Sequence, residues 1–145
     1  MIPLSRRSLF AIAAVVDVAL HARPMPVAAR ALAERHNLPP RHLETVLQAL
    51  VRAGILKGTR GPRGGYELAR ERRRVTVADI LRATGGTDEP GESESSLVER
   101  VILPVLAGAA DAFLAELDRI TVEDLCSRAG PSGEVAQSGF HDIGL

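Results

Sequence analysis

The sequence contains little cysteine and no long apolar run. A single cysteine, Cys126, among 145 residues excludes an intramolecular disulfide and any multi-cysteine zinc or iron–sulfur site formed by one chain. The most apolar stretch, Val101–Ala110, includes Pro104 and Gly108. It is much shorter than the roughly 18 residues that a membrane-spanning helix requires. We therefore expect no membrane segment, and the cysteine usage favours a reducing, cytoplasmic environment.

Two adjacent arginines precede an apolar stretch near the N-terminus, as they do in a twin-arginine export signal. However, Asp17 interrupts this stretch after eight apolar residues, and no small-residue cleavage site occurs before Pro24. The favoured interpretation is an amphipathic first helix.

The charge is divided unequally, although the net charge of the whole chain is zero. Residues 1–74 contain 14 Lys or Arg and 5 Asp or Glu, whereas residues 75–145 contain 4 and 13, so the two parts carry +9 and −9. A strongly basic half is typical of a protein that binds a polyanion such as DNA. All but one of the basic residues are arginine, which suits bidentate contacts to phosphates and bases.

Capping residues, prolines and glycines predict a mainly α fold with one small β-hairpin. Helices are expected over residues 5–21, 27–36, 39–53 and 76–84. Three glycines and a proline within residues 61–65 indicate a tight hairpin tip between two short strands. This order is that of a winged helix-turn-helix. We predict a DNA-binding domain over 1–84, an acidic linker over 85–95, a dimerisation helix over 96–128 and a loose tail over 129–145.

Helix 39–53 has one apolar face and one polar face. Such a helix can pack on its own domain while its polar face reads base edges in a major groove. An ordinary solvated face would have the same pattern, but the neighbouring hairpin favours DNA recognition. The candidate DNA-binding residues are Arg41, His42, Glu44, Thr45, Gln48, Arg60, Arg63 and Gly64.

A second apolar pattern lies in the C-terminal half. Large and small apolar side chains recur there at steps of three and four residues, which is typical of a coiled-coil-like seam. We expect a second copy of the chain to pack on this seam. The candidate interface residues are Leu103, Leu106, Ala110, Phe113, Leu117 and Ile120.

Three segments resemble the Rrf2 family of bacterial winged-helix regulators, which includes iron–sulfur-biogenesis and nitric-oxide-responsive repressors. These segments are Glu34–Glu44, Leu50–Leu56 and Arg60–Leu68, and Ile120–Leu125 resembles the end of the family's dimerisation helix. The resemblance implies a homodimer on a roughly palindromic operator. It also implies that Glu44 reads a base and that Arg60 enters the minor groove. Arg41 and His42 depart from the family pattern, so the operator preference of other members cannot be transferred.

The cofactor pattern also departs from the family. Cluster-binding members place three cysteines before the long helix, but residues 85–96 contain no cysteine or histidine. We therefore predict a cluster-free regulator with no cofactor. For Cys126, packing is favoured over a redox role, and the four histidines show no metal-binding spacing. The acidic linker is interpreted as a solvated loop, with an effector pocket as the alternative.

The leading prediction is therefore a dimeric, sequence-specific transcriptional regulator, most simply a repressor, that binds double-stranded DNA. The alternative is a winged-helix module that binds a protein or organises the chromosome without a specific operator. An enzyme is not expected, because no nucleophile, base and orienting group occur together.

Overall fold

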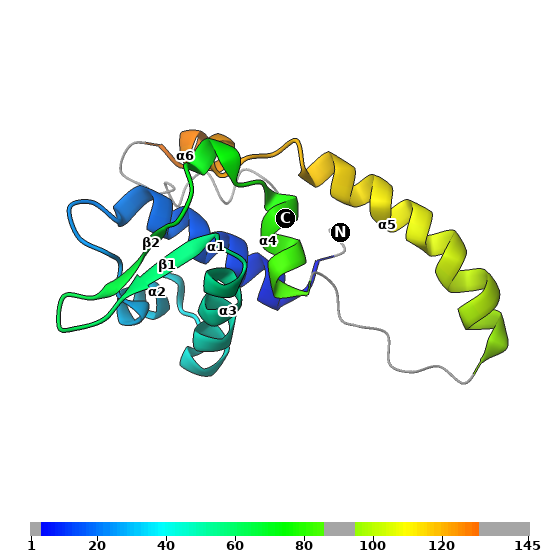
Figure 1. Ribbon diagram of the computed structural model, residues 1–145, viewed down its shortest axis with the longest axis horizontal. Coiled ribbons are helices and arrows are strands. Elements are labelled where there is room, and N and C mark those ends of the chain that lie inside the picture. Colours follow the sequence, from blue (N-terminus) through cyan, green and yellow to red (C-terminus); the bar gives the residue numbers. More distant parts are fainter. Residues whose placement is uncertain (1–3, 86–94, 131–145) are drawn as a thin grey trace.

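In the computed structural model, α1 (Arg6–His21) runs through the centre of a winged-helix body, and one long helix projects from that body (Figure 1). The structure describes residues 4–85 and 95–130. Around α1 lie the helices α2 (Ala29–His36), α3 (Pro40–Arg52) and α4 (Val77–Thr84). The predicted fold class, mainly α with a small hairpin, is confirmed.

Local sequence signals explain most helix ends. The Ser5 side chain accepts a hydrogen bond from the backbone N–H of Ser8 at the start of α1. Asn37 adopts the left-handed conformation that ends α2, and Pro40 is the first residue of α3. Thr76 and Asp79 form both halves of a capping box at the start of α4. These predicted boundaries are confirmed.

The hairpin pairs β1 (Leu56–Thr59) with β2 (Gly65–Leu68) in antiparallel register. Val27, which was predicted to begin the second helix, instead forms a β-bridge to Tyr66. The backbone N–H of Val27 donates to Tyr66 O at 2.9 Å, and Tyr66 N–H donates back at 2.7 Å. The prediction was wrong by two residues because this pairing satisfies backbone groups that a helix would otherwise use.

The charged connector after the hairpin contains a short 3₁₀ helix, η1 (Arg72–Arg74). It packs against α6 (Val122–Ala129), a helix that also contacts α1. Val122 and Cys126 of α6 belong to the hydrophobic core of the body. The end of the predicted dimerisation segment is therefore part of the winged-helix body.

Two α-helical residues, Ser96 and Leu97, precede a π-helical turn, η2 (Val98–Ile102), which continues directly into the long helix α5 (Leu103–Leu117). Ser95 Oγ accepts a hydrogen bond from Val98 N–H at 3.4 Å, one residue before the predicted start of the helix at residue 96. The π turn lies just before Pro104. Proline has no backbone N–H to donate, and its ring would clash with the preceding turn of a regular α-helix. Pro104 thus coincides with a change of helix type rather than with a break in the helix.

None of the helices within the described ranges is both long and apolar enough to cross a bilayer. The predicted acidic linker over 85–95 and the predicted tail over 129–145 lie mostly outside the described residues.

Candidate nucleic-acid interface

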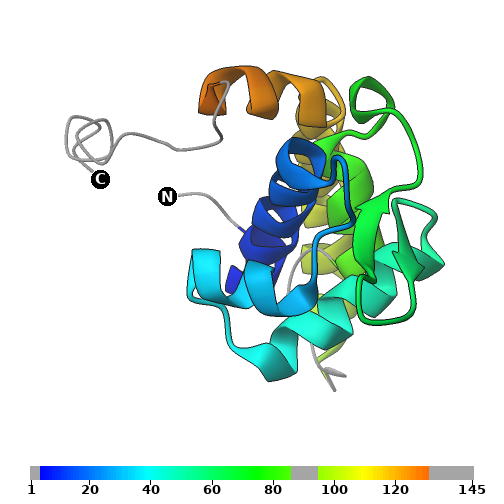
Figure 2. The same cartoon turned by 90° about the vertical axis from the view of Figure 1, so that its left-hand side faces the viewer.

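The helix α3 separates a buried apolar face from an exposed polar face, as its sequence predicts. The inward side chains are Leu43, Val46, Leu47 and Leu50, all at most 4% exposed. The outward side chains Arg41, His42, Glu44, Thr45 and Gln48 are all exposed. The apolar residues thereby fix the helix on its domain while leaving the polar ones accessible. In Figure 2, α3 lies along the lower edge of the body.

The fold brings the polar face of α3 next to the hairpin. Gln48 of α3 and Arg60 at the hairpin tip line one hollow of about 350 Å³, with Tyr66 in its wall. Glu44 lines a second groove, of about 660 Å³, between α2 and α3, and Tyr66 borders this groove as well. Tyr66 therefore borders both hollows, one lined by Gln48 and Arg60 and the other by Glu44, whereas Arg41, His42, Thr45, Arg63 and Gly64 line neither of them.

The cationic side chains of this region are exposed and available. Arg41, Arg60 and Arg63 form no ion pair or side-chain hydrogen bond with any group in residues 4–85 and 95–130. Thr45 differs, because its hydroxyl donates to Arg41 O within the helix at 3.4 Å. Unpaired guanidinium groups at a protein surface are well suited to phosphates and to guanine edges.

Two glycines determine the shape of the hairpin tip. A Cβ atom on Gly64 would collide with the backbone oxygen of Thr59, and one on Gly65 would collide with the backbone of Val27. The Gly64 N–H donates to Gly61 O at 2.9 Å and closes the turn. Gly64, a predicted DNA-binding residue, thus shapes the hairpin tip. Arg60 and Arg63 of the same tip are both exposed.

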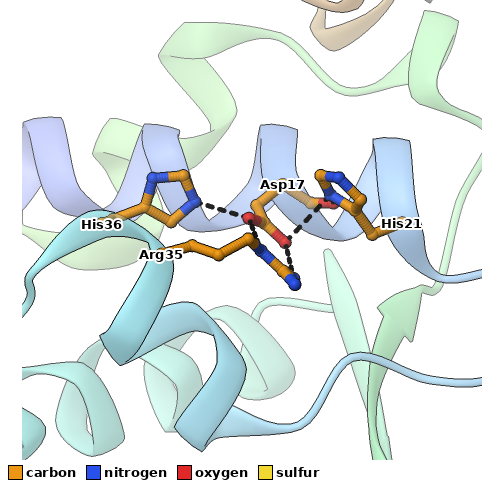
Figure 3. A network of polar contacts seen from close by, with 4 residues as sticks. All are labelled: Asp17, His21, Arg35 and His36. Carbon is orange, nitrogen blue, oxygen red and sulfur yellow. Dashed lines mark hydrogen bonds and ion pairs between the residues drawn. The ribbon is translucent and has the colours of Figure 1, made fainter. Parts of the chain in front are cut away.

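A buried carboxylate joins α1 to the first helix of the helix-turn-helix (Figure 3). Arg35 donates to Asp17 Oδ2 from Nε at 2.8 Å and to Oδ1 from Nη2 at 2.6 Å. His36 Nε2 contacts Oδ2 of the same carboxylate at 2.5 Å. His21 Nδ1 lies 3.0 Å from the backbone oxygen of Asp17, which is a hydrogen-bond acceptor. The network fixes the last turn of α2, directly before the turn that leads into α3.

The environment of Asp17 keeps it ionised. Burial alone would raise the pKa of its carboxyl, but hydrogen bonds from Arg35 and His36 hold that pKa below its ordinary value. The side chain of Asp17 is only 1% exposed. From the sequence, Asp17 was recognised only as an interruption of an apolar stretch, and its role in this network was missed. A lone acid on an otherwise apolar helix is the signal that could have identified it.

A family model described as Rrf2, iron-dependent transcriptional regulator, matches residues 4–128. The chain belongs to the Rrf2 family. The Synechocystis sp. protein slr0846, named an HTH-type transcriptional regulator, is 36% identical over 126 residues, covering 84% of this chain and 86% of that protein. The solved structure of T. potens IscR is 30% identical with a TM-score of 0.71, covering 97% and 96% of the two chains. CymR of B. subtilis, called the global cysteine regulator, is 27% identical with a TM-score of 0.67 and covers 90% and 100%.

These similarities confirm the resemblance identified from the sequence. The Rrf2 chain is a transcriptional regulator with a DNA-binding winged-helix fold, and its relatives are regulators rather than enzymes.

Iron is part of the family description, but the donor groups of this Rrf2 chain do not fit an iron–sulfur cluster. Such clusters are held by cysteine thiolates, with histidine as an occasional replacement. The single cysteine, Cys126, is packed in the core and 4% exposed. In the part of the chain that the structure describes, no group of three His, Cys, Asp or Glu side chains could hold a metal ion. We therefore assign no step of DNA binding to a cluster.

Proposed function

We propose that this Rrf2 protein is a homodimeric repressor that binds a roughly palindromic operator in the bacterial cytoplasm. In this proposal, α3 enters the major groove and the hairpin tip, residues 60–65, enters the adjacent minor groove. The observation that carries the proposal is that Gln48 of α3 and Arg60 of the hairpin line one hollow, and that Arg60 is exposed and has no ion-pair partner among the described residues. A surface that served only as a solvated face would not need a hairpin tip built to expose two arginines.

The chemistry of each side chain suggests its role. Arg41 can donate to guanine O6 and N7, Gln48 can pair with adenine, and Glu44 can accept from the amino group of cytosine. Arg60 is suited to a narrow minor groove, where the negative potential is enhanced. Arg63 is suited to the phosphate backbone, which positions the protein without reading sequence.

The exposed apolar surface of α5 supports the dimer. Its side chains include Val105 at 70% and Leu106 at 56% exposed. Within Leu103–Leu117 the only charged residues are Asp111 and Glu116. A helix that is apolar on all sides is normally covered. The predicted seam residues are exposed or half-buried here, so a second copy of α5 can reach them.

Two single substitutions test the assignment of the DNA-binding surface. Arg60→Ala should weaken binding to all operator variants, whereas Glu44→Ala should mainly relax base preference, each by about 1–3 kcal/mol. Arg73→Ala is a matched control, because Arg73 is an exposed arginine on η1 that pairs with Glu71. Fluorescence anisotropy with operator and scrambled duplexes would measure both effects. Wild-type affinity and selectivity in both variants would reject the assignment.

The alternative function, a protein-binding or chromosome-organising module, predicts a different result. A specific regulator protects discrete genomic sites, and its affinity falls steeply with salt concentration. A genomic footprint of the purified protein without discrete sites would favour the alternative.

A further inference from the structure

The end of α5 is attached to the winged-helix body through a carboxylate. Asp118 is the C-cap residue of α5. Arg82 of α4 donates to Asp118 Oδ1 from Nη1 at 3.0 Å and to Oδ2 from Nη2 at 2.9 Å. The Thr76 hydroxyl donates to Asp118 Oδ1 at 3.1 Å. Two parallel bonds from a planar guanidinium restrict the direction of the carboxylate as well as its distance.

A carboxylate at the C-terminal end of α5 is unfavourable for that helix by itself. The C-terminal end of a helix carries partial negative charge, so an acid is unfavourable there and a cation is favourable. The last turn of α5 contains no basic residue. Arg82 supplies the missing cation from another helix, and its hydrogen bonds hold the pKa of Asp118 below the ordinary value.

Backbone hydrogen bonds reinforce the attachment. Val77 N–H donates to Ile120 O at 2.9 Å, and Val122 N–H donates to Val75 O at 2.8 Å. These bonds flank a β-bridge between Thr76 and Thr121, which are the N-caps of α4 and α6. Each of these threonines also forms a complete capping box. The exit of α5 from the body is therefore fixed by main-chain as well as side-chain contacts.

The helix α4 connects this attachment to the DNA-binding surface. It packs against both α1 and α3, with Ile80 and Leu81 buried. By contrast, every residue from Leu103 to Ala112 is exposed. Figure 1 shows α5 extending away from the body beyond this attachment. Among the described residues, the direction of α5 relative to α3 is thus set at its C-terminal end.

We propose that Arg82 and Asp118 are positioning residues that determine which half-site spacing the protein accepts. This inference rests on the dimeric function proposed above. If two α5 helices pair, the distance and rotation between the two α3 helices depend on the angle at which each α5 leaves its body. One extra base pair moves a half-site by about 3.4 Å and rotates it around the duplex, so a rigid attachment accepts few spacings.

The test uses duplexes recovered from a random-sequence pool by repeated selection with the wild-type protein. The two half-sites of the recovered duplex are then moved apart or together by one base pair. We expect the wild type to bind the altered duplexes about tenfold more weakly. Arg82→Ala should reduce this preference to about threefold or less, while Arg119→Ala should retain it. Arg119 is a matched control because it is an exposed neighbouring arginine, in the turn after α5, that pairs with Glu116 near the end of that helix.

A second variant and two further measurements separate positioning from folding or assembly. Asp118→Asn removes the charge but keeps an oxygen acceptor, so its spacing preference should lie between those of the wild type and Arg82→Ala. Exchange of the pair, Arg82→Asp with Asp118→Arg, should recover part of the preference. Light scattering and thermal unfolding should show that all these variants remain folded dimers.

The possible failures can be distinguished. If Arg82→Ala and Asp118→Asn both keep the wild-type spacing preference, the positioning inference is wrong and the proposed function is unaffected. If these variants become monomers, the pair acts in assembly, and the inference is also wrong. If the wild type selects no paired half-sites, the proposed dimeric function fails by itself.

Discussion

Large apolar side chains are buried in the winged-helix body but exposed on α5. In the body, Leu47 and Leu50 are fully buried, whereas Leu106 of α5 is 56% exposed and Val105 is 70% exposed. Both regions contain the same kinds of apolar side chain, so the difference lies in the polar residues that accompany them. In the body, the apolar face of α3 is buried while the polar face of the same helix remains in contact with water. The helix α5 has almost no polar residues, and the proposed dimer would cover its apolar surface with a second copy of the chain.

The largest expected effect concerns the exposed region. Phe113→Asp places a charge in the α5 seam and should convert the dimer to a monomer. Loss of the second half-site contact should then weaken operator binding by about a thousandfold, because binding of linked sites is favoured by effective concentration. Light scattering and anisotropy would measure the two effects, with Asp111→Asn as a control on the same helix. A Phe113→Asp protein that remains dimeric would refute the seam assignment.

A smaller effect is expected in the buried region. Leu47→Ala removes a fully buried side chain and should lower the free energy of unfolding by about 2–5 kcal/mol, whatever the protein concentration. Leu106→Ala should instead shift the concentration dependence of unfolding, because in the proposed dimer its partner lies on another chain. Urea denaturation at two protein concentrations would separate the two cases. If the two variants showed the same dependence of unfolding on protein concentration, the proposed difference between the body and α5 would be wrong.

The buried carboxylate of α1 should have a still smaller effect. Asp17→Asn weakens the hydrogen bonds to Arg35 and His36 and should lower the free energy of unfolding by about 1–3 kcal/mol at neutral pH. Because the pKa of Asp17 is lowered by folding, its contribution is present above its unfolded pKa of about 3.9. That contribution is lost as the pH falls through the folded pKa, so the two proteins should converge in acid. Denaturation at a series of pH values would measure this convergence. A difference in the free energy of unfolding that does not change with pH would contradict the prediction.

No effect is expected at Cys126. Burial raises the pKa of its thiol, so little reactive thiolate is present, and no other cysteine is available to the chain. Protein purified without oxygen should contain no iron or sulfide, and Cys126→Ala should bind DNA with wild-type oxygen dependence. Iron and sulfide in stoichiometric amounts would contradict the cluster-free prediction.

Local features of the fold could be predicted because neighbouring residues determine them. The turn at Asn37, the helix start at Pro40 and the Thr76–Asp79 capping box lie within one residue of the helix boundaries expected at 36, 39 and 76. Each acts on backbone groups within a few residues, so its effect does not depend on distant parts of the chain. The polar face of α3 was predictable for the same reason, since helical periodicity alone separates it from the buried face.

Features that join distant segments could not be predicted in this way. Whether Val27 continues a helix or pairs with Tyr66 depends on where the hairpin lies. Asp17 meets Arg35 and His36 only after α1 and α2 pack together. The exit angle of α5 depends on the contact between Asp118 and Arg82, 36 residues apart.

The helices and strands, the polar face of α3 and the family of the chain all follow from the order of the residues. The tertiary structure alone decided which apolar surfaces are covered and how α5 is attached to the body. The physical reason is that capping and periodicity act over a few residues, whereas burial and ion pairing depend on which segments meet in space.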